Sequence, residues 1–217
     1  MAVEAYLEVS PKRTFAGAVA WPGWCRSGRD EAAALQSLVD YGPRYRRVLS
    51  NTGLVLAVPV ATDQLVLVGR VAGNAGTDFG VPSMPAPGDD GPLDAPALAR
   101  QAAILRACWA ALDRAAGAAA GRELTKGPRG GGREVPAILA HVADAEAGYL
   151  SRVAWRAPDD ALARRSAVLE ALTAVARLGT PPPRGPGGTR WPARYFARRV
   201  AWHALDHAWE IDDRTPG

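Results

Sequence analysis

Residues 199–211, near the end of the chain, read RVAWHALDHAWEI, and their pattern indicates the architecture of the C-terminal part. His203 and His207 stand four residues apart, and positions four apart lie on one face of an α-helix. At about 100° per residue, both histidines fall on a narrow stripe of otherwise apolar side chains. The members of this stripe are Phe196, Val200, His203, His207 and Ile211. The pattern predicts a helix over residues 191–212 whose histidines face inward.

Three segments upstream have the same helical periodicity and are rich in alanine. They cover residues 94–116, 134–155 and 159–178. A Gly/Pro-rich stretch at 127–132 lies between the first and the second, and another at 179–192 lies between the third and the C-terminal helix. Asp94 with Pro96 is a favourable N-cap and first-turn pair for the first of them. Each segment is long enough for a four-helix bundle, and small alanine side chains allow close helix packing.

The N-terminal part has a different pattern. Nine of the twenty residues from 73 to 92 are Gly or Pro, which is typical of a linker or a long surface loop. Before it we expect strands at 3–9 and 15–21, a helix at 30–40 that Gly42-Pro43 ends, a second helical stretch up to Leu49, and strands at 54–60 and 64–71. The predicted fold class is α+β. A small α+β unit (1–75) and a linker (76–93) precede a four-helix bundle (94–217).

Composition narrows the function classes. The net charge of +4 comes from 26 basic and 22 acidic residues, and the basic residues cluster only in pairs, so we expect no nucleic-acid partner. The apolar stretches are too short to span a bilayer, and the first residues lack the features of a secretory signal. Cys25 and Cys108 lie far apart and are expected to stay reduced. The expected location is cytoplasmic, with no membrane association.

The three histidines of the chain carry the strongest functional signal. His203 and His207 can present two imidazoles to one ion, and His141, on the second predicted helix of the bundle, can supply a third ligand. The alternative is that each histidine is hydrogen-bonded separately in the core or lies at a helix end. No Glu follows His203 directly, so the sequence does not fit the zinc-protease motif.

Two segments resemble the DinB-like superfamily: residues 138–146 (ILAHVADAE) with Tyr149-Leu150, and residues 199–211. The resemblance covers residues 94–214 and implies a four-helix bundle that holds a divalent metal, zinc or nickel, through His141, His203 and His207. Mycothiol-dependent maleylpyruvate isomerases and bacillithiol transferases of this superfamily use the metal to bind a low-molecular-weight thiol. The isomerases have a carboxylate at one ligand position, where this chain has histidine.

Two carboxylates accompany the histidines. Glu210 lies three residues beyond His207 on the same face, so it is a candidate catalytic residue as a general base, a fourth ligand, an acceptor behind an imidazole, or a partner of Arg199 or Arg214. Glu146 falls among apolar positions of its helix, where we expect a buried ion pair with an arginine.

A shorter similarity concerns the N-terminal unit. Residues 21–25 (WPGWC), Gly28 and Glu31-Ala32 resemble the hairpin-to-helix junction of HicB-like antitoxin domains. Two functions from different classes stay open for the whole chain. One is a metal-dependent small-thiol S-transferase, with a small-molecule thiol and an electrophilic substrate as partners. The other is a non-catalytic metal-binding stress or partner-binding protein. Homodimerisation is left open in both.

Overall fold

The computed structural model describes residues 2–126, 132–178 and 190–216. The chain is α+β and divides into two compact units, Met1–Gly91 and Pro92–Gly217. The Gly/Pro-rich stretches predicted at 127–132 and 179–192 lie largely outside the described residues. No helix among the described residues is long and apolar enough to cross a membrane.

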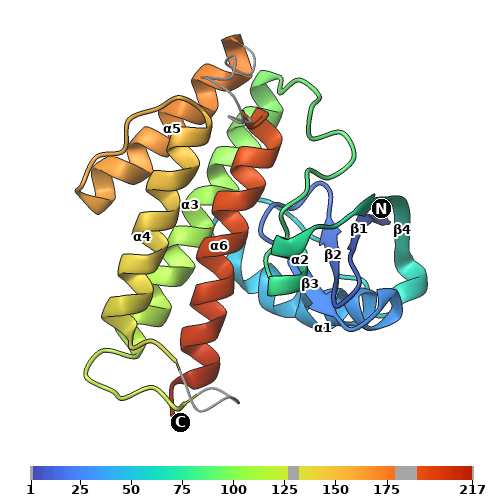
Figure 1. Ribbon diagram of the computed structural model, residues 1–217, viewed down its shortest axis with the longest axis horizontal. Helices are drawn as coiled ribbons and strands as arrows, with labels where there is room; N and C mark the ends of the chain where they lie inside the picture. Colours follow the sequence, from blue (N-terminus) through green and yellow to red (C-terminus); the bar gives the residue numbers. More distant parts are fainter. Residues whose placement is uncertain (1, 127–131, 179–189, 217) are drawn as a thin grey trace. The chain divides into compact units, whose positions relative to one another are not determined.

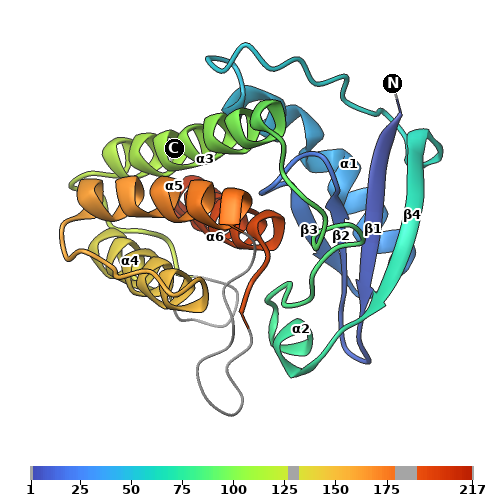
Figure 2. The same ribbon diagram turned by 90° about the horizontal axis from the view of Figure 1, so that it is seen from above.

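The first unit is a four-stranded sheet in the order β3-β2-β1-β4 (Figure 1). Strands β1 (Val3–Val9) and β2 (Thr14–Ala18) form an antiparallel pair, as do β2 and β3 (Cys25–Gly28), whereas β4 (Leu65–Ala72) runs parallel to β1. Helix α1 (Glu31–Val48) packs against β2 and β3 on one face of the sheet (Figure 2). A short 3-10 helix, Thr62–Gln64, precedes β4.

Aromatic packing fixes α1 to the sheet. The Trp24 and Tyr45 rings stack with centroids 5.5 Å apart, and both side chains are almost fully buried. Their polar atoms are satisfied, because Trp24 Nε1 donates to the Leu38 carbonyl at 2.8 Å and Tyr45 Oη donates to the Pro22 carbonyl at 2.8 Å. Of the residues that resemble a HicB-like junction, Trp24 and Cys25 therefore lie in the core of this unit, whereas Ala32 is exposed.

Two sequence expectations for the first unit are wrong. Gly42-Pro43 does not end the helix: α1 continues through Pro43, whose missing N–H removes a single helical hydrogen bond. Gly42 instead marks close packing, since a Cβ there would lie 2.5 Å from Val58 Cγ1. The expected strand at 54–60 forms no strand. Of its three valines, Val55 and Val60 are exposed and only Val58 is partly buried, so the β-branched composition does not mark a buried strand.

The segment expected as a linker is also different in the structure. Helix α2 (Ala75–Phe79) lies within it, and the chain up to Gly91 belongs to the first unit. A fully buried carboxylate holds the segment to β1, since Glu8 accepts hydrogen bonds from Thr77 Oγ1, from Ser83 N at 2.9 Å and from Met84 N at 3.2 Å. The Gly and Pro residues shape a packed loop around this carboxylate.

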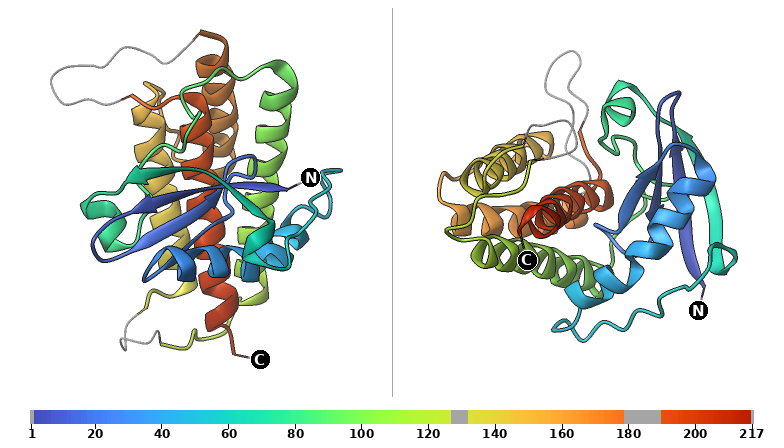
Figure 3. Two further views of the ribbon diagram at one scale, coloured as in Figure 1. Left: turned by 90° about the vertical axis from the view of Figure 1, so that its right-hand side faces the viewer. Right: turned by 90° about the horizontal axis from the view of Figure 1, so that it is seen from below.

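The second unit consists, in its described residues, of four helices that pack against one another: α3 (Ala95–Ala118), α4 (Val135–Arg152), α5 (Ala161–Leu178) and α6 (Ala193–Arg214) (Figure 3). Asp94 caps α3 as predicted, with its carboxylate accepting from Ala97 N at 2.8 Å. Helix α6 contacts each of the other three and has most of its side chains buried. This burial brings the His203–His207 face against α4.

Candidate metal centre

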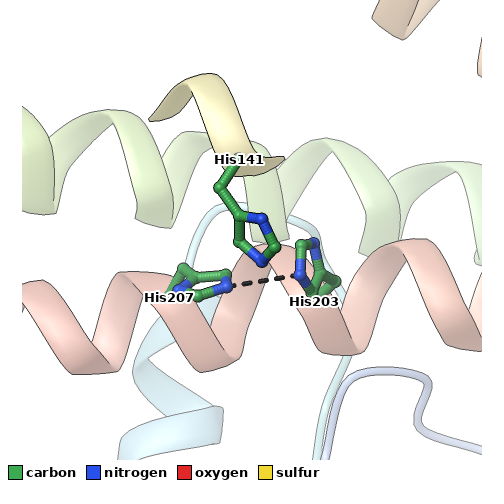
Figure 4. Close-up of side chains that lie close together, drawn as sticks. All are labelled: His141, His203 and His207. Atoms are coloured by element: carbon green, nitrogen blue, oxygen red, sulfur yellow. Dashed lines mark hydrogen bonds between the residues drawn. The ribbon is translucent and has the colours of Figure 1, made fainter. Parts of the chain in front are cut away.

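The structure brings the three histidines together. His141 projects from α4, and His203 and His207 project from α6, so that the three rings face one another (Figure 4). One ring nitrogen from each lies within 4.8 Å of the others, and the Nε2 atoms of His203 and His207 are 3.2 Å apart. Two nitrogens bound to one tetrahedral zinc at about 2.0–2.1 Å would be about 3.3–3.4 Å apart. The α6 pair already has this spacing.

Burial sets the charge of the rings. His203 is 7% and His207 8% exposed, whereas His141 is half-buried. Burial, assisted by His207 and His141, lowers the pKa of His203 to about 2. Burial also lowers the pKa of His141. At neutral pH these two imidazoles are neutral, and a neutral imidazole offers the lone pair that a metal ion needs.

Hydrogen bonds among the described residues do not satisfy every ring nitrogen of the three histidines. The contact between His203 Nε2 and His207 Nε2 can hold only one proton, and His203 Nδ1 is buried with no hydrogen-bond partner among the described residues. Buried polar atoms are normally paired, so the alternative of three separately satisfied core histidines does not describe His203. The donor set of three convergent imidazoles fits a borderline-soft divalent cation such as zinc or nickel.

Glu210 lies behind His207 instead of between the rings. Its Oε2 is 2.7 Å from His207 Nδ1, and its Oε1 accepts from Arg214 Nη1 at 2.8 Å. The hydrogen bond with His207 lowers the pKa of Glu210, with Arg214 contributing further. An ionised Glu210 selects the His207 tautomer with the proton on Nδ1 and leaves the Nε2 lone pair directed at the other rings. Of the roles considered for Glu210, this geometry matches two: the acceptor behind an imidazole and the partner of Arg214.

Arg214 ties the same end of α6 to the connection between α3 and α4. Its guanidinium donates to the Thr125 carbonyl at 2.9 Å and to the Arg133 carbonyl at 2.8 Å, and Thr125 N donates back to the Arg214 carbonyl at 2.8 Å. The chain of contacts from this connection through Arg214 and Glu210 to His207 holds the imidazole in one orientation.

Sequence reasoning named Tyr149 and Arg199 but did not place them beside the centre. Tyr149, two helical turns beyond His141, has its ring centroid 5.9 Å from that of His203. Arg199, one turn before His203, donates from Nη2 to Tyr149 Oη at 3.2 Å. Spacings of eight along α4 and four along α6 place these residues on the histidine faces. This spacing was the sequence signal that could have placed both residues beside the histidines.

Glu146 has a different partner from the expected one. The structure shows no ion pair with an arginine for this carboxylate among the described residues. Trp109 Nε1 donates to Glu146 Oε1 at 2.6 Å, and Arg165 forms a two-point ion pair with Asp113. Burial raises the pKa of Glu146, so this group belongs to the bundle core.

The two cysteines are not placed for chemistry. Cys25 lies in the first unit and Cys108 in the second, and both are buried. Burial strongly raises the pKa of Cys108, which keeps it as an unreactive thiol.

Comparison with known proteins found no similar protein. No protein-family model matches the chain, and no similar curated protein or solved structure was found.

Proposed function

We propose that this chain is a DinB-like protein that binds one divalent metal ion, zinc or nickel, through His141, His203 and His207. The observation that carries the proposal is the convergence of three ring nitrogens within 4.8 Å on the inner faces of α4 and α6. Three protein ligands leave one position for an exogenous group, as in catalytic zinc sites.

We further propose that the metal-loaded protein is a small-thiol S-transferase. A bound divalent cation lowers the pKa of a thiol that reaches it and so supplies thiolate at neutral pH. The protein's own cysteines are buried, which supports a nucleophile that comes from a low-molecular-weight thiol. In the reaction, the sulfur electron pair forms a C–S bond to the electrophilic carbon, the leaving group departs with its bonding pair, and the thiol proton passes to solvent.

The residues around the proposed centre have different roles. The two α6 imidazoles and His141 hold the ion, Glu210 fixes the His207 tautomer, and the apolar surroundings exclude water from the buried side. The half-buried His141 marks the side from which a thiol approaches. The first unit, with its HicB-like resemblance, is proposed as an interaction module without a chemical role.

The test is thiol conjugation measured with 1-chloro-2,4-dinitrobenzene, which releases chloride. Zinc-loaded or nickel-loaded protein is assayed with mycothiol, bacillithiol, glutathione and coenzyme A. We expect turnover that requires both metal and thiol, is lost in His141→Ala, and persists in Cys25→Ala and Cys108→Ala. A protein that binds metal but gives no turnover above free metal and thiol, and no calorimetric thiol binding, is instead the non-catalytic metal-binding protein.

A further inference from the structure

Arg214, the last residue of α6, joins the end of this helix to two points of the connection between α3 and α4. Its Nε donates to the Thr125 carbonyl at 2.9 Å, and its Nη1 donates to the Arg133 carbonyl and to Glu210 Oε1, both at 2.8 Å. The Arg214 carbonyl in turn accepts from Thr125 N at 2.8 Å and from Thr125 Oγ1 at 2.9 Å. We call Arg214 and these three partners the Arg214 clamp. Because a guanidinium is planar and its donors are rigidly spaced, these bonds fix its position.

The clamp is closely packed. The Arg214 side chain is only 11% exposed, and Gly132 lies directly against its guanidinium. A Cβ at position 132 would lie 2.6 Å from Arg214 Cζ, and the φ of +152° at this residue favours glycine. Leu124 of the connection and Ile211 of α6 belong to one buried hydrophobic cluster. A side chain at position 132 would therefore displace the guanidinium from a packed site.

Glu210 connects the clamp to the histidines. It uses one carboxylate oxygen for each neighbour, since Oε1 accepts from Arg214 and Oε2 lies 2.7 Å from His207 Nδ1. The Glu210 side chain is 32% exposed, so without a partner it would have several rotamers available. Ordering a glutamate side chain costs conformational entropy. With Arg214 in place this cost falls on folding instead of on metal binding, and the acceptor behind His207 is pre-organised.

We infer that Arg214 is a positioning residue of the metal centre and that the clamp couples metal binding to the connection between α3 and α4. The inference rests on the proposed metal centre and goes beyond it by assigning a residue that regulates its affinity. Coupling between two sites is reciprocal. A metal ion bound by His207 therefore holds Thr125 on Arg214 by the same factor by which the clamp strengthens metal binding.

The first experiment measures zinc affinity of the full chain by competition with a chromophoric chelator. Arg214→Met should weaken zinc binding about threefold, as for the net loss of one hydrogen bond. Arg214→Lys keeps the positive charge but cannot donate to Glu210 and to both carbonyls at once, so it should weaken binding similarly. The matched control is Arg194→Met on the same helix, whose guanidinium donates to the Pro92 carbonyl and which should keep wild-type affinity.

A second pair of variants leaves Arg214 and Glu210 in the chain. Gly132→Ala displaces the guanidinium and should weaken zinc binding about threefold, like Arg214→Met. Gly121→Ala is its control, since Gly121 also has a positive φ, of +74°, but a Cβ there would have no neighbouring atom within 4 Å. It introduces backbone strain in the same connection without reaching the clamp, and it should keep wild-type affinity.

Two further readouts distinguish positioning from a general effect on the fold. In a Glu210→Ala background, Arg214→Met should no longer change zinc affinity, because the link to His207 is already lost. Saturating zinc should slow hydrogen exchange of the Thr125 amide about threefold in the wild-type protein and leave it unchanged in Glu210→Ala. The reference amide is that of Ala97, which donates to the Asp94 side chain and should not respond to zinc.

The outcomes separate this inference from the proposed metal centre. Absence of zinc binding by the wild-type protein overturns the centre itself. Zinc binding that is unchanged in folded Arg214→Met and in Gly132→Ala overturns the role of the clamp alone. An effect of Arg214→Met that persists at full size in the Glu210→Ala background also overturns it. If Arg214→Met does not fold, Gly132→Ala and the exchange of the Thr125 amide in the wild-type protein decide the question.

Discussion

Glu210 is expected to strengthen metal binding without touching the metal. Its carboxylate lies 2.7 Å from His207 Nδ1, and a charge-assisted hydrogen bond at this distance stabilises by about 1.5–3 kcal/mol. The Glu210 side chain is 32% exposed, so solvent screening places the effect at the lower end of that range. Since about 1.4 kcal/mol corresponds to a tenfold change in affinity, Glu210→Gln should weaken zinc binding about tenfold.

The two substitutions at this position form a graded series. A glutamine carbonyl can still accept the proton on His207 Nδ1, so Glu210→Gln removes charge but retains ring orientation. Glu210→Ala removes both, and loss of the carboxylate behind a metal-binding histidine costs up to about 100-fold in affinity. Zinc affinity is measured by competition with a chromophoric chelator at constant pH.

The matched control is Glu170→Gln on α5, an exposed carboxylate whose replacement removes the same charge away from the histidines. It should leave zinc affinity unchanged. If Glu210→Gln and Glu170→Gln bind zinc within twofold of each other, the hydrogen bond to His207 does not support the centre and the reasoning from its geometry fails.

Three further predictions concern the fold. Gly42→Ala should destabilise the protein by about 1–3 kcal/mol in urea unfolding, because the added Cβ would lie 2.5 Å from Val58 Cγ1. Gly117→Ala, where a Cβ would have no neighbouring side chain within 4 Å, should stabilise it by about 0.5–1 kcal/mol. The opposite order of stabilities would contradict the packing described for Gly42. Burial raises the pKa of Glu146, so its ionisation costs stability as the pH rises above about 4.5. Glu146→Gln should therefore gain stability relative to wild type between pH 4 and pH 7. A difference in unfolding free energy between variant and wild type that stays constant over this range refutes the prediction. The fragment of residues 92–217 should melt cooperatively on its own, and an unfolded fragment contradicts its description as a compact unit.

Much of the second unit follows from its sequence. The predicted helices begin and end within three residues of α3, α4, α5 and α6, because a 3.6-residue apolar period and Gly/Pro breaks are local signals. The first unit was harder to predict. Gly42 and Pro43 look like a helix stop, and only the tertiary contacts of Gly42 with Val58 and Trp24 show that this position needs a glycine within the helix.

The candidate site shows the same division between local and tertiary information. The spacing of His203 and His207 is a property of one helix, so their shared inward face could be predicted. The contact of Arg199 with Tyr149, and that of Glu146 with Trp109, join different helices and depend on how far each helix is shifted along its neighbour. A single sequence does not specify that shift.

X-ray absorption on the zinc-loaded full chain tests the central claim most directly. Without added thiol, we expect one zinc per chain with three imidazole nitrogens at about 2.0–2.1 Å, one further light atom and no sulfur. With a small thiol, one sulfur at about 2.3 Å should replace the light atom. A metal centre with fewer than three imidazoles, or with cysteine sulfur in the absence of added thiol, would contradict the assignment of His141, His203 and His207 as the metal ligands.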